Sequence, residues 1–327
     1  MYTDDDLNSA IEQNIFTNDA VSKFKLHVES LKETPSVDEE NFRLIGGFND
    51  IFVVIACILL LVSSAAVLGV ISKTLASIAF PFIAWGLAEF FIRKRKMALP
   101  AIVLLLFFVG GVYGSAMFLT NSSLLISTAL AAIAAYLHYQ RFQVPITIAA
   151  GTAAAAGFVV SVLISVFPVL KEWIMPLLFI CGVGLFFFAM YWDALDRARE
   201  TRYSDVAFWL HLLSAPLIVH PVFSSLGIFE GVDSAINMTI VILLYLLMTI
   251  ISISIDRRAF MVSSLIYVLY AIANILEAYG VVGQSLAITG VCIGGALLLL
   301  SAFWQPIRKY LVQLLPLSLQ RYLPKIN

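Results

Sequence analysis

Long apolar runs alternate with short polar stretches along the chain after residue 50. A helix needs about 20 apolar residues to cross roughly 30 Å of hydrocarbon, so each run predicts one membrane-spanning helix. Because most connections are short, we expect tight hairpins in one all-α bundle rather than two membrane domains. The ten predicted spans are 51–72, 74–92, 99–119, 121–139, 144–166, 173–192, 206–229, 235–255, 260–279 and 282–303.

Composition supports an integral membrane protein. Hydrophobic residues make up 61% of the chain and charged residues 13%, with a mean hydropathy of +0.95. Soluble domains carry about 25% charged residues, so a soluble fold is excluded. The lipid bilayer is therefore an expected partner, and no basic segment interleaved with aromatics indicates nucleic acid.

The positions of the basic residues predict how the chain is oriented. With ten spans, 18 of the 20 Lys and Arg fall on one side, and only Lys73 and Lys171 fall on the other. Cytoplasmic loops hold the excess of Lys and Arg, so both termini are predicted to be cytoplasmic. We expect a multi-pass protein of the plasma membrane.

Residues 1–45 are predicted to form a separate acidic cytoplasmic helical hairpin. Up to Glu40 this segment has ten Asp and Glu against three Lys, a net charge of −7, which leaves +6 on the remainder. Thr3 and Asp6 resemble a capping box for a first helix, and Thr17 or Asn18 caps a second. Because so short a piece buries little surface, we expect it to dock on the membrane domain or on a cytoplasmic protein partner.

Two polar segments flank the later spans. Residues 193–205 are predicted to continue a solvated helix held by charge pairs three and four residues apart. Residues 304–327 are predicted to form an amphipathic interfacial tail in which Arg308 and Lys309 face anionic lipid headgroups. The remaining segment, 46–303, is the predicted ten-span transmembrane domain.

Small residues and one acidic residue give further expectations within the spans. The Gly110-x-x-x-Gly114 and Gly290-x-x-x-Gly294 patterns allow close helix contact. Glu89 precedes Arg93 by one helical turn, which predicts an ion pair at the cytoplasmic edge of the second span.

The ninth span carries a polar stripe. Ser263, Tyr267, Tyr270, Asn274 and Glu277 recur at helical spacing and therefore share one face. Such a stripe must face the bundle interior or water, because lipid would leave it unsatisfied. It predicts either the lining of a substrate path or hydrogen bonds that hold helices together.

The seventh span contains His211 and His220, with Asp205 and Arg202 at its predicted cytoplasmic mouth. Nine residues separate the two histidines, about 13 Å along a straight helix, so they cannot share a metal unless Pro216 and Pro221 break the span. Each histidine is interpreted either as a neutral side chain hydrogen-bonded across helices or as a proton-handling or ligand-contacting group.

Motifs that carry enzyme chemistry were not found. The sequence has no Gly-rich phosphate loop, no G-x-S-x-G elbow and no Cys or His spacing typical of metal sites. Its three Cys, residues 57, 181 and 292, all fall within predicted spans. We therefore predict no catalytic residue, no metal and no cofactor.

Several segments along the chain carry a similarity to a known family. They are 38–43, 47–53, Ser204 to His211, His220-Pro221, Asp256 to Ala259, Trp304-x-x-x-Arg308 and Leu323-Pro324. These segments resemble a family of uncharacterised bacterial polytopic membrane proteins with a domain-of-unknown-function label. The similarity covers nearly the whole chain and implies a bacterial inner-membrane location and an N-terminal cytoplasmic helical piece, but no activity.

Topology alone gives a second similarity. Ten spans with both ends inside is similar to drug/metabolite transporters, which are built from inverted five-helix repeats. We therefore predict a small-solute transporter of unidentified ligand. The alternative is a regulatory or scaffold protein acting through residues 1–45, and a third possibility is a membrane-embedded metal-dependent enzyme.

Overall fold

The computed structural model describes residues 7, 9–11, 13, 15–24, 48–199, 201–227, 235–278 and 283–325. All regular structure in these residues is helical. The chain divides into two compact units, residues 1–42 and 43–327. The second unit is the all-α, membrane-type fold that the apolar runs predict.

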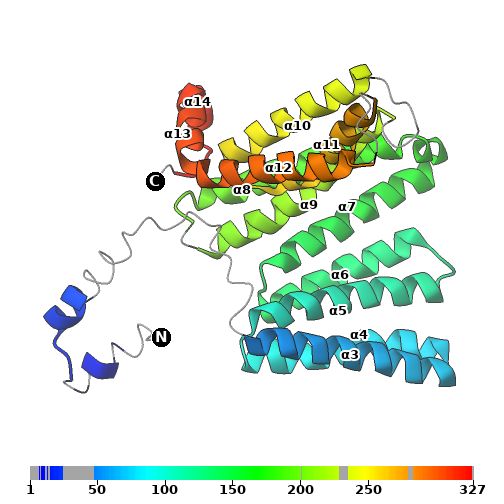
Figure 1. Ribbon diagram of the computed structural model, residues 1–327. Coiled ribbons are helices and arrows are strands. Elements are labelled where there is room, and N and C mark those ends of the chain that lie inside the picture. Colours follow the sequence, from blue (N-terminus) through cyan, green and yellow to red (C-terminus); the bar gives the residue numbers. More distant parts are fainter. Residues whose placement is uncertain are drawn as a thin grey trace. The chain divides into compact units, whose positions relative to one another are not determined.

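The first five long helices of the larger unit pack mainly as neighbours in chain order (Figure 1). Apolar side chains at helical spacing join α3 to α4 and α5, and a second cluster joins α5, α6 and α7. The helices are α3 (Phe48–Ile71), α4 (Lys73–Ala88), α5 (Ala98–Leu119), α6 (Leu124–Phe142) and α7 (Ile146–Val166).

The later helices are arranged differently. α9 packs against α7, α8 and α11, while α10 and α12 pack on α11, and α13 packs on α10. The helices are α8 (Ile174–Leu195), α9 (Arg202–Ser224), α10 (Ala235–Ile255), α11 (Ala259–Ala278), α12 (Ser285–Ala302), α13 (Trp304–Leu314) and α14 (Leu317–Gln320).

Helices lie at all ten predicted span positions, and nine of those in the described residues are long and apolar enough to cross a membrane. The exception is α6, whose last turns carry His138, Gln140 and Arg141. The ten-span count and the orientation that depends on it therefore stay predictions.

Two spans contain residues or turns that could interrupt an α-helix, and only one of them is interrupted. α4 continues into a π-helix at Glu89–Lys94, whereas the sequence pattern indicated an uninterrupted α-helix. α9 contains Pro216 and Pro221 and is nevertheless one helix from Arg202 to Ser224. The span that holds both histidines is therefore not divided into two helices.

The close helix contacts lie at other glycines than the predicted pairs. A Cβ added at Gly110, Gly114, Gly290 or Gly294 would meet no atom of the described residues within 4 Å, so the described helices do not use these two patterns for close contact. A Cβ added at Gly182 of α8 would lie 2.9 Å from the backbone of Leu217 in α9. The absence of a side chain at Gly182 allows the α8–α9 contact.

In the smaller unit, the described residues form parts of two helices. Residues 18–24 are helical, and the Thr17 hydroxyl accepts a hydrogen bond from the Ala20 amide at 3.2 Å, which confirms Thr17 as the cap. Leu7, Phe16, Ala20, Val21 and Phe24 line an apolar groove of about 390 Å³. The predicted cap at Thr3 and Asp6 lies outside the described residues.

Candidate functional site

Three buried charged or titratable side chains meet where α8 ends and α9 begins. Asp193 of α8 accepts a 2.8 Å hydrogen bond from Nε2 of His211 in α9 and pairs at 2.5 Å with the guanidinium of Arg257. The Arg257 guanidinium also donates to the carbonyl and hydroxyl oxygens of Ser204, at 3.1 and 3.2 Å. The exposed fractions of Asp193, His211 and Arg257 are 1%, 0% and 2%, so this is a core ion pair rather than a surface one.

The hydrogen bond to Asp193 indicates which nitrogen of His211 carries the proton. An ionised carboxylate only accepts hydrogen bonds, so Nε2 of the imidazole must donate. In the neutral ring, Nδ1 then has a free lone pair, and Nδ1 is buried with no hydrogen-bond partner among the described residues. This atom is a candidate contact for a proton or a solute donor.

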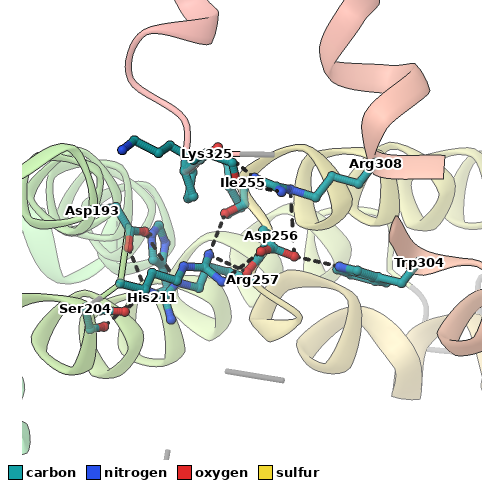
Figure 2. A network of polar contacts seen from close by, with 11 residues as sticks. Asp193, Ser204, His211, Ile255, Asp256, Arg257, Trp304, Arg308 and Lys325 are labelled. Carbon is teal, nitrogen blue, oxygen red and sulfur yellow. Dashed lines mark hydrogen bonds and ion pairs between the residues drawn. The ribbon is translucent and has the colours of Figure 1, made fainter. Parts of the chain in front are cut away.

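A second buried carboxylate, Asp256, lies beside this group in the turn between α10 and α11 (Figure 2). Its two oxygens contact the Arg199 guanidinium at 2.7 Å and the Trp304 indole N–H at 2.6 Å. The Arg308 guanidinium lies 3.8 Å away. We call Asp193, Arg199, Ser204, His211, Asp256, Arg257, Trp304 and Arg308 the ionic cluster.

The backbone around the ionic cluster is partly strained. Arg199 and Asp256 have φ angles of 57° and 56°, in the left-handed region that few non-glycine residues occupy. Such a conformation costs on the order of 1 kcal/mol or more and persists only where the surroundings impose it. At Asp256 the left-handed conformation ends α10, where the Arg257 amide donates to the Ser252 carbonyl at 2.9 Å.

Residues 323–325, at the end of the described chain, are hydrogen-bonded to arginines of the same region. Arg308 donates to the carbonyl oxygens of Pro324 and Lys325 at 2.8 and 3.2 Å, and Arg197 donates to that of Leu323 at 2.8 Å. The exposed fraction of Arg308 is 0%, so the prediction that it faces lipid headgroups is wrong. Its guanidinium instead contacts the carbonyl oxygens of Pro324 and Lys325 and the carboxylate of Asp256.

The predicted helix through residues 193–205 is also wrong. α8 ends at Leu195 and α9 begins at Arg202. Asp196 accepts hydrogen bonds from the amide and the hydroxyl of Thr201, at 2.8 and 2.7 Å. These contacts favour a turn over a continued helix, because they satisfy the amides at the start of α9.

The predicted path residues fall into separate groups. The Tyr267 hydroxyl of α11 lies 2.6 Å from Nδ1 of His220 in α9. Toward the other end of α11, Glu277 accepts a 2.7 Å hydrogen bond from Ser285 of α12. Asn274 donates to the carbonyl of Tyr270, one turn earlier on its own helix, at 3.0 Å.

Aromatic side chains surround the two histidine groups. Phe186 of α8 lies 5.6 Å from the His211 ring and 5.4 Å from the Phe260 ring, measured between centroids. Phe223 lies 4.7 Å from the ring of Tyr267. These rings belong with Val219 to one apolar cluster or its contacts, so both histidine groups lie against the same apolar core.

The two residues predicted at the mouth of α9 lie at its first turn. Arg202 is exposed, whereas Asp205 is half-buried. The charges of Arg257, Arg202 and Asp196 are close enough to interact with the Asp205 carboxylate. In the described part of the chain, no three His, Cys, Asp or Glu side chains lie together as a metal site would need. His211 and His220 each pair with a different helix.

Sequence reasoning missed the acidic and basic members of the ionic cluster as site residues. Six members of the cluster lie in the three short segments 204–211, 256–259 and 304–308: Ser204, His211, Asp256, Arg257, Trp304 and Arg308. These segments are spread over about a hundred residues of the sequence but meet at one site in the fold. They were the indication of the site that the sequence offered. Searches of protein-family models, curated proteins and solved structures found no match to this chain.

Proposed function

We propose that this protein is a small-solute transporter of a bacterial inner membrane whose path runs between α9 and α11. The observation that carries the proposal is the polar character of this helix pair. Ionisable side chains in a membrane span are costly and mark pathways or relays when they face the bundle interior. His211 of α9 contacts Asp193 of α8 near one end of this pair, beside Arg257 just before α11. Further along, His220 of α9 contacts Tyr267 of α11.

In this proposal the ionic cluster closes the inner end of the path. Its charges join α8, α9, the α10–α11 turn and α13, so opening this end requires those segments to separate. Ion-pair networks suit such a role because they have two discrete arrangements, paired and hydrated, rather than a continuous range. Both termini are then cytoplasmic, as the distribution of basic residues predicts.

The solute would contact polar atoms that the closed arrangement leaves buried. Nδ1 of His211 is the first of these. Tyr270, Asn274 and Glu277 continue the polar face of α11 toward the far end, where Glu277 is exposed.

Cysteine accessibility tests the proposal without knowledge of the substrate. Ala207 lies in α9 within the span between Ser204 and His211 and has an exposed fraction of 0%. In a background without native Cys, Ala207→Cys should react with a membrane-impermeant maleimide only when the inner end opens. Asp256→Asn should raise that labelling rate.

Ala88→Cys is the matched control. Ala88 is also 0% exposed and ends α4, in the other half of the unit. The proposal predicts labelling at residue 207 that responds to Asp256→Asn and to solutes, with residue 88 protected. Equal protection of both cysteines in every condition would contradict a gated path.

A thermal-shift screen in nanodiscs identifies the solute class. A ligand that binds only the folded protein raises its melting temperature by mass action. Metabolites should be compared with His220→Ala and Glu277→Gln variants, in which a shift caused by a path ligand should disappear. A ligand shift that survives in both variants would place the solute elsewhere.

A regulatory or scaffold function through residues 1–45 is the second candidate. It is favoured by the separate compactness of residues 1–42 and by the apolar groove around Phe16 and Phe24, whose exposed fractions are 49% and 41%. A photo-crosslinker at residue 16 in the full chain should capture a second protein if this function is correct. Crosslinking only within the chain would contradict it.

A further inference from the structure

The far end of α4 carries a π-helical turn next to a cluster of cations. Residues Glu89–Lys94 form this turn, and the amide of Arg95 donates to the carbonyl of Phe90 at 3.2 Å. A π turn contains an extra residue, which changes the direction of the side chains that follow, and such turns are frequent at functional sites. The left-handed residue Lys96, with φ 52°, ends the segment.

The charge balance at this turn is positive. Glu89 is its carboxylate, and both carboxylate oxygens are bound by Arg141 of α6, at 2.6 and 3.1 Å. The predicted partner Arg93 lies further away, at 3.6 Å. The five cations Arg93, Lys94, Arg95, Lys96 and Arg141 exceed this one carboxylate by four charges.

A groove lies among these cations. Gly86, Glu89, Phe90, Arg93 and Lys94 line it, and its volume is about 400 Å³. A Cβ added at Gly86 would meet no atom within 4 Å, so the glycine leaves one wall open. The charged ends of Lys94 and Arg95 lie 5.9 and 5.8 Å from the centroid of the Phe90 ring, at the boundary between apolar and charged surface.

An exposed apolar strip leads into the groove. Ile78, Phe82 and Phe90 have exposed fractions of 42%, 73% and 43%. Ile78, Phe82 and Gly86 are spaced four residues apart on α4 and therefore lie above one another on one face. An acyl chain can cover such an exposed apolar strip, and the cations lie at its end.

We propose that this groove binds the headgroup of an anionic phospholipid, with an acyl chain along Ile78 and Phe82. The headgroup phosphate would accept hydrogen bonds from Arg93 and Lys94, while Glu89 holds Arg141 beside them. Basic pockets at the ends of membrane helices recognise anionic headgroups by this combination of charge and adjacent apolar surface. The proposal is independent of whether the α9–α11 pair forms a transport path.

Native mass spectrometry of the full-length protein tests the proposal with phosphatidylglycerol and phosphatidylcholine of identical acyl chains. Phosphatidylglycerol should bind more tightly to the unmodified chain. The double variant Arg93→Gln, Lys94→Gln should weaken that binding by about tenfold or more, because each cation near a membrane surface adds substantially to anionic lipid binding. Binding of phosphatidylglycerol that is unchanged in this variant would overturn the site.

Two further variants separate a built groove from general positive charge. Gly86→Leu fills the groove without changing charge and should also weaken binding. Lys73→Gln with Lys171→Gln removes the same charge from exposed positions elsewhere and should leave binding unchanged. If Gly86→Leu binds normally, or the control pair loses as much affinity, the groove is not the site; melting temperatures verify that each variant folds.

Competition with inorganic phosphate identifies the source of the ligand. A lipid site keeps phosphatidylglycerol bound when free phosphate is added, because the acyl chain contributes binding that phosphate lacks. Displacement by phosphate at equal concentration would mean that the groove recognises a free anion, and would overturn the lipid assignment.

Discussion

The two halves of the membrane unit hold their polar side chains in different ways. In α3–α7 the charged contact is exposed: Glu89 pairs with Arg141 and Arg93, and the Glu89 and Arg141 side chains are 30% and 42% exposed. The buried His138 contacts the neutral hydroxyl of Thr147 at 3.3 Å. In α8–α13 the charged groups share partners across four segments, and most are almost fully buried. Water can satisfy the exposed contacts of Glu89, whereas the buried charges of α8–α13 require one particular arrangement of the helices.

This difference follows from the environment of each charge. An exposed pair is already solvated and contributes little, whereas a buried charge that loses its partner keeps the full cost of desolvation. The later half therefore depends on its polar contacts more strongly than the earlier half. The following substitutions test that contrast, beginning with the largest expected effect.

Asp193→Asn should destabilise the protein most. The substitution removes the carboxylate that contacts both His211 and Arg257 while preserving side-chain size. Loss of one partner of a buried pair costs about 3–5 kcal/mol. Thermal unfolding in nanodiscs should show a large fall in melting temperature, and the double variant Asp193→Leu, Arg257→Met should recover much of it. An unchanged melting temperature for Asp193→Asn would remove the contrast between the halves.

Gly182→Ala should have the next largest effect. The added methyl group would lie 2.9 Å from the backbone of Leu217 and from the side chain of Ile218, so α8 and α9 must separate. Overpacking of this kind costs about 1–3 kcal/mol. Gly184→Ala, which meets nothing within 4 Å, is the matched control on the same helix and should not lower the melting temperature. Equal effects of the two variants would contradict the tight α8–α9 contact.

Tyr267→Phe should have a smaller effect, because it removes one hydrogen bond to His220 and keeps the aromatic ring. Hydrogen bonds between membrane helices contribute about 0.6 kcal/mol on average. A double-mutant cycle with His220→Phe measures the coupling between the two side chains. If no coupling is detected, the pair does not join α9 to α11.

Glu89→Gln should produce no measurable change in melting temperature. The carboxylate and its partner Arg141 are both accessible to water, and salt screens such pairs. The measurement is the same unfolding experiment at low and high salt. A fall as large as that of Asp193→Asn would show that the earlier half depends on its charges equally.

Sequence periodicity predicted the helices far better than it predicted their partners. All ten predicted spans coincide with helices, because about twenty apolar residues have few alternatives to a buried or lipid-facing helix. The same reasoning selected Gly110 and Gly290 for close packing, whereas the close contacts occur at Gly182 and Gly111. A glycine pattern shows which faces can approach and does not show which faces do.

The polar residues show the same division. His211 and His220 were identified from sequence, because titratable groups in an apolar run are conspicuous. Asp193 was assigned to a solvated polar segment and Arg308 to the membrane interface, since each stands at the end of an apolar run, and Asp256 was given no role. Only their burial in the folded chain separates them from the exposed charges of neighbouring loops, such as Arg202.

The alternation of apolar and polar stretches alone determined the helical membrane class, the helix positions and the separate acidic segment. These properties depend on local chemistry, because transfer into lipid and helix formation are decided within about twenty residues. The tertiary structure decided that Asp193, Asp256 and Arg308 are buried together and that Arg141 holds Glu89. Such contacts join residues about 50 or more positions apart in the sequence. They can form, and contribute to stability, only after the helices have packed.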